Sequence, residues 1–123
     1  MGSTTSRTFS PDAEQIGSAR RFAMGVVRGW GLASDDVGLV VSELAANAVL
    51  HARSSFDVSL YHEGRRVVVE IADSNPRPPA MATFPPSGPS GRGLVIVDRL
   101  STAWGVVPLT SRGKVVWAEV DCT

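Results

Sequence analysis

The sequence predicts an α+β domain, a two-layer α/β sandwich in which helices cover one face of a mostly antiparallel sheet. Two helical patterns come first, two strand patterns follow, and a third helix and two further strands close the chain. Consecutive strands joined as hairpins pair antiparallel. The three expected helices are enough to cover one face of such a sheet. The 123 residues, 43% hydrophobic and 20% charged, are enough for one domain with its own core.

The N-terminal segment is rich in Ser and Thr, which predicts a flexible N-terminus over residues 1–8 and a single domain over residues 9–123. A short edge strand at Arg7-Thr8-Phe9 is expected at their junction. The first helix is predicted to follow, with Ser10 as its N-cap, Pro11 at its first position and glycines at its end.

The second helix carries the polar row around which the rest of the chain is organised. Ser34 is predicted to cap it, and Ala, Leu and Val dominate its later turns. Glu43, Asn47 and His51 are spaced i, i+4, i+8, which places a carboxylate, an amide and an imidazole on one helix face beside an apolar stripe. An Asn oxygen can bind Mg²⁺, and a nearby Glu can orient or deprotonate a nucleophile. Taken alone, such a row is more often a solvated helix flank, and both interpretations stand at this point.

The next segment predicts an antiparallel hairpin. Phe56–His62 alternates apolar and polar residues, Val67–Ala72 is rich in β-branched residues, and Glu63-Gly64-Arg65 forms the turn between them. Asp73 ends the second strand. Residues 74–90 contain most of the prolines of the chain and predict a mobile lid, because crowded prolines exclude a helix or an inner strand.

A third helix is predicted after the lid, where Gly91-Arg92-Gly93-Leu94 opens it. Two glycines at a helix start let backbone N–H groups approach an anion, and the helix dipole favours negative charge there. Plain turn chemistry explains such a pair more often, so the pattern alone does not decide. Two strands, Ala103–Val107 and Lys114–Val120, complete the sheet around a turn at Ser111-Arg112-Gly113.

Composition argues against several classes of function. Lys plus Arg balance Asp plus Glu at 12 each and no basic run is present, so general nucleic-acid binding is not expected. The lone Cys122 cannot form a disulfide within the chain, which fits a reducing cytoplasm. No apolar run is long enough for a membrane span, and no signal pattern opens the chain. Two His and one Cys provide no ligand cluster for a metal hydrolase.

Three separated elements carry a resemblance: the Glu43…Asn47 helix, Asp73 at a strand end, and Gly91-Arg92-Gly93-Leu94 at a helix start. In this order they resemble the N-box and the two glycine boxes of the GHKL ATPases. That Bergerat-fold group includes gyrase, a heat-shock chaperone family, histidine kinases and mismatch-repair ATPases. The joint pattern is specific, although each box alone is not.

The resemblance is greater to small stand-alone members of that group, the anti-sigma-factor serine/threonine kinases and the ATP-binding regulatory proteins of actinobacteria. Trp104-Gly105 and Gly113-Lys114-Val115-Val116-Trp117 also look like these proteins. The similarity extends over roughly residues 9–121.

The resemblance implies bound ATP and Mg²⁺, a histidine-kinase-type ATPase fold, and a role for each matched residue. Glu43 would be the general base that activates a Ser or Thr hydroxyl, or a water, for attack on the γ-phosphate. Asn47 would coordinate Mg²⁺, and Asp73 would accept the adenine amino group. The other matched residues would line the site, contact the phosphates or anchor the lid: His51, Gly91, Arg92, Gly93 and Leu94.

The implied function is that of a cytoplasmic, ATP-dependent serine/threonine kinase of the anti-sigma-factor type. It would bind a sigma factor and phosphorylate an anti-sigma-factor antagonist, without direct contact with nucleic acid or membrane. The resemblance leaves open whether the protein forms a homodimer, which proteins are its partners and whether it turns over ATP.

One departure from the family pattern favours an alternative. The first glycine box usually carries glycines soon after its Asp, but Asp73 is followed by Ser74-Asn75-Pro76-Arg77-Pro78. The alternative is a non-catalytic binding module on the same fold, either switched by nucleotide or merely sequestering a partner. The catalytic domain of a sensor histidine kinase ranks lower, since the chain shows no dimerisation helices and no second domain with a phospho-accepting His.

Overall fold

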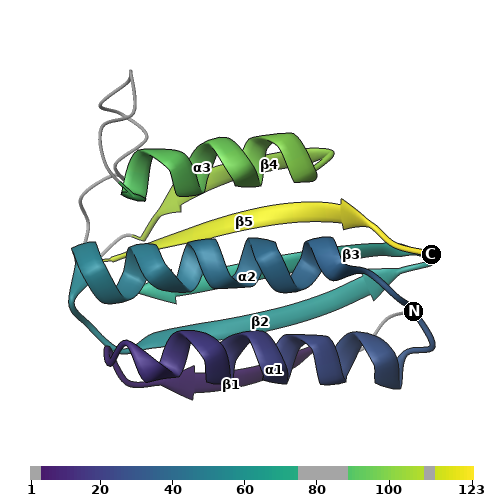
Figure 1. Cartoon of the computed structure of the whole chain (residues 1–123), viewed down its shortest axis with the longest axis horizontal. Coiled ribbons are helices and arrows are strands. Elements are labelled where there is room, and N and C mark those ends of the chain that lie inside the picture. The colour runs from purple at the N-terminus through teal and green to yellow at the C-terminus, as the bar shows by residue number, and fades with distance from the viewer. Residues whose placement is uncertain (1–3, 75–88, 110–112) are drawn as a thin grey trace.

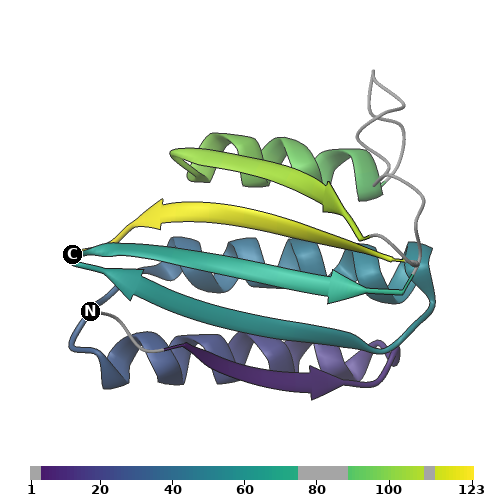
Figure 2. The ribbon, with the colours of Figure 1, turned by 180° about the vertical axis from the view of Figure 1, so that it is seen from behind.

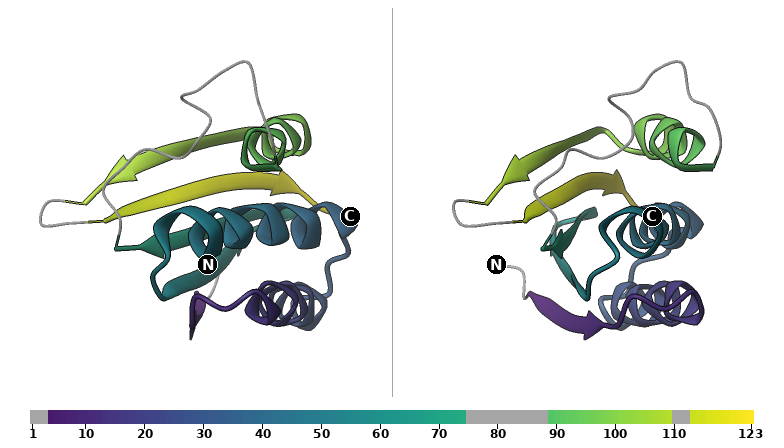
Figure 3. Two further views of the ribbon diagram at one scale, coloured as in Figure 1. Left: turned by 60° about the vertical axis from the view of Figure 1, so that its left-hand side comes forward. Right: turned by 90° about the vertical axis from the view of Figure 1, so that its left-hand side faces the viewer.

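The computed structural model describes residues 4–74, 89–109 and 113–123, with residues 51–52 and 89–93 described by their backbone alone. Five antiparallel strands form one sheet in the order β1-β2-β3-β5-β4, and helices cover one of its faces (Figures 1 and 2). Figure 3 shows the two layers from the side, so the predicted α+β sandwich is confirmed. The elements are β1 Thr5–Phe9, α1 Glu14–Gly29, α2 Asp35–Asn47, η1 Ala48–Ala52, β2 Phe56–Glu63, β3 Arg66–Asp73, α3 Pro89–Leu100, β4 Ala103–Pro108 and β5 Lys114–Asp121.

Strand alternation builds the core between the two layers. Val58, Leu60 and Ile71 point toward the helices and are at most 1% exposed, whereas their neighbours along the strands are partly or fully exposed. Leu44 of α2 and Leu94 of α3 are buried against this face. Each fully buried Val, Leu or Ile side chain stabilises the fold by about 1.5–3 kcal/mol, which holds the helices on one side of the sheet.

β1 is longer than the sequence predicts. It begins at Thr5 and pairs with β2 along its whole length, so residues 5–8, which the sequence predicts as flexible, belong to the sheet. The hydroxyls of Ser6 and Ser59 lie 2.7 Å apart and add a hydrogen bond to the pairing. Only Phe9 of this strand is buried, so no apolar alternation reveals the strand in the sequence.

α1 begins at Glu14, later than predicted, and Ser10 is not its N-cap. The Ser10 hydroxyl instead donates to Asp12 Oδ2 at 2.7 Å, so this local hydrogen bond replaces the cap. The predicted stop is confirmed, because α1 ends at Gly29 and Gly31 follows at a φ of 77°.

α2 begins as predicted, and helical structure continues to the end predicted near His51-Ala52-Arg53. Ser34 caps it, since its Oγ accepts a hydrogen bond of 3.2 Å from the backbone three residues later. After Asn47 the helix widens into the π-helical turn η1, and Arg53 N–H donates to the Ala48 carbonyl at 2.9 Å. π-helical turns are rare in proteins, and those that occur often lie at functional sites.

Gly113, the residue before β5, lies against the backbone at the end of β3. Its φ of 94° lies in the left-handed region, and a methyl group there would collide with the carbonyl oxygen of Asp73. Gly64, in the turn between β2 and β3, has a similar φ of 62° but no heavy atom within 4 Å of an added Cβ.

Gly113→Ala is expected to lower the free energy of unfolding by about 3 kcal/mol or more, because collision with the backbone adds to the cost of a positive φ. Gly64→Ala should lose only the backbone cost of about 1–2 kcal/mol. Urea denaturation of both variants beside the wild type measures the two losses. Equal losses would show that the close approach at Asp73 has no energetic weight.

Candidate functional site

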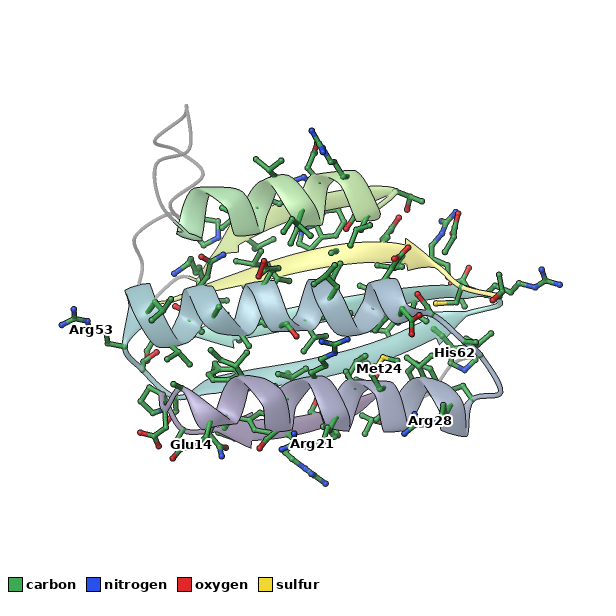
Figure 4. All side chains as sticks on the ribbon, in the orientation of Figure 1. Glu14, Arg21, Met24, Arg28, Arg53 and His62 are labelled. Atoms are coloured by element: carbon green, nitrogen blue, oxygen red, sulfur yellow. The ribbon has the colours of Figure 1, made fainter. Side chains whose placement is uncertain are left out.

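α2 lies between α1 and α3 (Figure 1). Gly38 marks the side of α2 that faces α1. A Cβ at Gly38 would lie 2.8 Å from Met24 Sδ, so the two helices touch here, and Figure 4 places Met24 between them. At 3.6 residues per turn, Glu43 and Asn47 lie about 140° and 180° around the helix from Gly38. The predicted polar row therefore faces α3 rather than α1.

Asn47 has hydrogen-bonding capacity to spare. The side chain is partly buried, and its Nδ2 is shielded from solvent without a hydrogen-bond partner among the described residues. An unsatisfied buried donor costs about 1–3 kcal/mol, so native structures usually pair it with a water or a ligand. Rotation of the amide exchanges nitrogen for oxygen, and Mg²⁺ binds through one or two protein oxygens plus waters and phosphates. Asn47 therefore fits a magnesium ligand.

Glu43 lies one turn before Asn47 and is also partly buried. Its carboxylate makes no hydrogen bond or ion pair within the part of the chain that the structure describes. The carboxylate is therefore free to accept a proton from a hydroxyl held beside it. Val40, fully buried on the same side of the helix, supplies an apolar wall next to this pair.

The elements that carry the predicted boxes meet at one end of the molecule. The end of α2 with η1, the end of β3, the start of β5 and the start of α3 all lie there (Figures 1 and 2). Asn47, Asp73 and the start of α3 are thus brought to the same end despite their distance in sequence. His51 lies in η1, and the positions of its side chain and of most of the predicted lid, residues 75–88, fall outside the described residues.

Asp73 stands at the end of β3, as predicted, and pairs in register with Lys114 at the start of β5. Lys114 Nζ lies 3.0 Å from Asp73 Oδ2 and donates to Oδ1 at 3.1 Å, and the two side chains are only 7% and 4% exposed. The sequence places Lys114 inside a matching motif but assigns it no role. A signal was present, because Lys114 shares the inward-facing positions of β5 with Val116 and Ala118, and a cation there requires a buried anion.

The ion pair does not exhaust Asp73 as an acceptor. A carboxylate offers about four acceptor positions, and a single ammonium group occupies only part of them. A carboxylate held by one ammonium group can therefore still accept an N–H of a ligand.

The start of α3 lies two residues earlier than predicted. The helix begins at Pro89, so Gly91-Arg92-Gly93 lies within its first turns instead of opening it. The N–H groups of a first helical turn have no partner within the helix and can bind a phosphate. The Leu94 side chain is fully buried in the core, and Leu94 lies beyond the first turn of α3. The side chain of Arg92 lies outside the described residues.

The family is decided by a match that extends over nearly the whole chain. The model of the histidine kinase-like ATPase domain matches residues 9–120. The chain belongs to the histidine kinase-like ATPase domain family. Membership in this family implies ATP binding.

The structure of this chain is also similar to a solved structure. It is the crystal structure of the RsbU and RsbW domains of Rv1364c from Mycobacterium tuberculosis, which superposes on this chain with a TM-score of 0.71 and 16% sequence identity. The superposition covers 98% of this chain and 32% of the matched chain. At this identity the likeness concerns the fold alone, and this chain spans about a third of the matched chain's length. No curated protein matches the chain.

No group of three or more His, Cys, Asp or Glu in the described ranges could hold a metal ion. None of the helices described for this domain combines the length and the hydropathy that a membrane crossing requires.

Lys114→Met is expected to lower the free energy of unfolding by about 3–5 kcal/mol, because it leaves the Asp73 carboxylate buried without this ammonium group. Asp73→Leu should cost a similar amount. The double variant should lose much less than the sum, since no charge of the pair then remains buried. Chemical denaturation of the four proteins gives the coupling energy.

A matched control lies on the same two strands. Arg66 and Asp121 face each other in register at the opposite end, 3.9 Å apart, with side chains 56% and 66% exposed. Their cycle, with Arg66→Met and Asp121→Leu, should give a coupling of about 0–1 kcal/mol. A coupling of the same size in both cycles would contradict a special role for the buried pair.

Proposed function

We propose that this domain is an anti-sigma-factor-type serine/threonine kinase that uses Mg·ATP. The observation that carries the proposal is the polar row on the α3 side of α2. There, Glu43 is partly buried without a partner among the described residues, and the buried amide nitrogen of Asn47 is unsatisfied by them. The family match supports ATP as ligand, and the likeness to a structure with an RsbW domain supports the regulatory assignment.

The chain's own residues divide the work of phosphoryl transfer. Asp73 would accept the adenine amino group, and the free N–H groups at the start of α3 would bind the phosphates. Asn47 would hold Mg²⁺, which supplies positive charge to the phosphate oxygens when bound. Glu43 would take the proton of a Ser or Thr hydroxyl. The hydroxyl oxygen would form a bond to the γ-phosphorus while the bond between that phosphorus and the bridging oxygen breaks, and ADP would leave. Positioning and charge neutralisation would supply most of the catalysis.

The proposed partners are proteins. A sigma factor would be bound, and an anti-sigma-factor antagonist would be the phosphorylated substrate, in the cytoplasm. A composition without basic excess supports protein partners rather than nucleic acid, because nucleic-acid binding needs clustered cations.

A second candidate function is a module on the same fold that binds nucleotide or a partner without catalysis. The specific observation in its favour is the ion pair at Asp73, whose carboxylate is held 3.0 Å from Lys114 Nζ inside the protein. A carboxylate that must serve both an internal cation and adenine would bind nucleotide less tightly.

Glu43→Ala is expected to reduce phosphate transfer by about 10²–10⁴-fold, the usual contribution of a general base, while leaving affinity for Mg·ATP nearly unchanged. Asn47→Ala should weaken binding of Mg·ATP but not of ATP in EDTA, since only the metal contact is lost. Calorimetry measures binding, and labelled ATP with candidate antagonist proteins measures transfer. Glu14→Ala, an exposed carboxylate on α1 that points away from the body of the molecule in Figure 4, is the control.

The outcomes separate the candidate functions. Binding heat without any transfer favours the nucleotide-switched module, and no heat at all favours sequestration of a partner. Unchanged transfer by Glu43→Ala would remove Glu43 from the mechanism.

A further inference from the structure

The sheet has a second face, which no described helix covers. Figure 2 shows it toward the viewer, with the helices behind. Strand alternation directs a different set of side chains to this side, and the register aligns them across strands. Tyr61, Val68 and Glu119 form one row over β2, β3 and β5, and Glu70 and Trp117 form part of the next.

Two adjoining hollows mark this face. One has a volume of about 510 Å³ and the other about 320 Å³, and both are lined by Tyr61, Val68 and Glu119. The smaller hollow also includes Glu70 and Trp117, and the larger one extends toward the turn between β2 and β3. We call the residues Tyr61, Val68, Glu70, Trp117 and Glu119 the open-face patch.

An aromatic side chain of this patch packs against the neighbouring strand β4. A Cβ at Gly105 of β4, the register partner of Trp117, would lie 3.0 Å from the indole Cζ2 and Nε1. The indole therefore covers the bare backbone of Gly105, and Trp117 and Tyr61 are both partly exposed. Partly exposed aromatic side chains are typical anchors for a partner side chain.

The patch has a negative electrostatic character. Glu70 and Glu119 are diagonal neighbours on adjacent strands, partly buried, and neither carboxylate forms an ion pair or hydrogen bond among the described residues. Burial, together with Glu70, Glu119 and Glu63, raises the pKa of Tyr61 above its usual value of 10.0. Arg65 and Arg66 line the part of the larger hollow toward the turn between β2 and β3, and Arg66 Nε lies 3.9 Å from Asp121 Oδ1. Neither arginine forms an ion pair with Glu70 or Glu119 among the described residues.

We propose that the open-face patch binds a basic segment of a partner protein, with an arginine side chain between Glu70 and Glu119. The guanidinium group would pair with the two carboxylates, and its flat face and aliphatic stem would pack on Trp117 and Val68. A second copy of the chain fits less well, because a two-fold contact would bring these carboxylates against their own equivalents.

The proposal does not depend on the proposed kinase activity. The patch is on the face of the sheet opposite the helix that carries Glu43 and Asn47 (Figure 3). Loss of one activity therefore leaves the other measurable in the same protein.

A fluorescein-labelled peptide that alternates arginine and leucine serves as the probe, and the same peptide with glutamine for arginine is its control. Fluorescence anisotropy should show binding of the arginine peptide alone, with affinity that falls as salt rises. The double variant Glu70→Gln/Glu119→Gln should bind the peptide at least about tenfold more weakly. Glu14→Gln/Asp35→Asn makes the same change in net charge at exposed helix positions and should change affinity less than about threefold.

Several results would overturn the proposal: equal binding of the glutamine peptide, equal loss in the two double variants, or no binding up to about 1 mM arginine peptide. Sedimentation that shows a wild-type dimer dissociated by Trp117→Ala would also overturn it, because the patch would then be occupied by a second copy. Circular dichroism and thermal melting of each variant verify the fold. Calorimetry with Mg·ATP on Glu70→Gln/Glu119→Gln should match the wild type, so that failure of this proposal is distinguished from failure of the kinase assignment.

Discussion

The buried Asp73–Lys114 ion pair is the constraint on which the geometry of the site depends. The two residues are 41 positions apart, and the chain between them includes α3 and β4. A shift of one residue in the pairing of β3 with β5 would turn Lys114 to the opposite face and leave the Asp73 charge buried without it. Desolvation of two charges offsets much of their attraction, so the pair contributes more to the choice of register than to net stability. The register in turn fixes which residue of β5 lies beside Asp73 at the end of β3.

α2 shows how stability and function compete within one helix. Its sheet-facing side is apolar and fully buried at Val37 and Val41, as stability alone requires. Asn47 breaks that rule, because its amide nitrogen is buried without a partner among the described residues. An apolar residue of similar size would avoid this cost of about 1–3 kcal/mol. Departures of this kind are expected where a polar group serves a ligand, and the adjacent π-helical turn is a second departure at the same place.

The elements that the sequence predicts correctly depend on local signals. Ser34 caps α2 because its side chain needs only the backbone three residues later, and Val58 and Leu60 alternate because a strand has a period of two. The elements that the sequence predicts wrongly depend on a competing hydrogen-bond partner or on a residue far away in the chain. Ser10 had Asp12 as a rival partner, and the first residues of β1 are held by a strand some fifty positions away.

The same distinction applies to the site. The spacing of Glu43 and Asn47 places them on one helix face without any knowledge of the fold. Which neighbour this face meets depends on the contact of Gly38 with α1, a contact that no local pattern encodes. The role of Lys114 was missed for a related reason, since its partner Asp73 becomes a neighbour only through the pairing of β3 with β5.

β3 and β5 contribute to both faces of the sheet, because successive residues of a strand point to opposite sides. Asp73 and Lys114 face the helices. Glu70, three residues before Asp73, and Trp117, three residues after Lys114, are register partners and face outward. At about 3.3 Å per residue the separation along the strand is about 10 Å, close to the Debye length at 0.1 M salt. The charge of Asp73 is balanced by Lys114, so a cation on the outer face changes the field at the proposed nucleotide site only weakly. The two ligands should therefore bind additively unless one of them alters the pairing of β3 with β5, since coupling requires a difference in structure that both ligands sense.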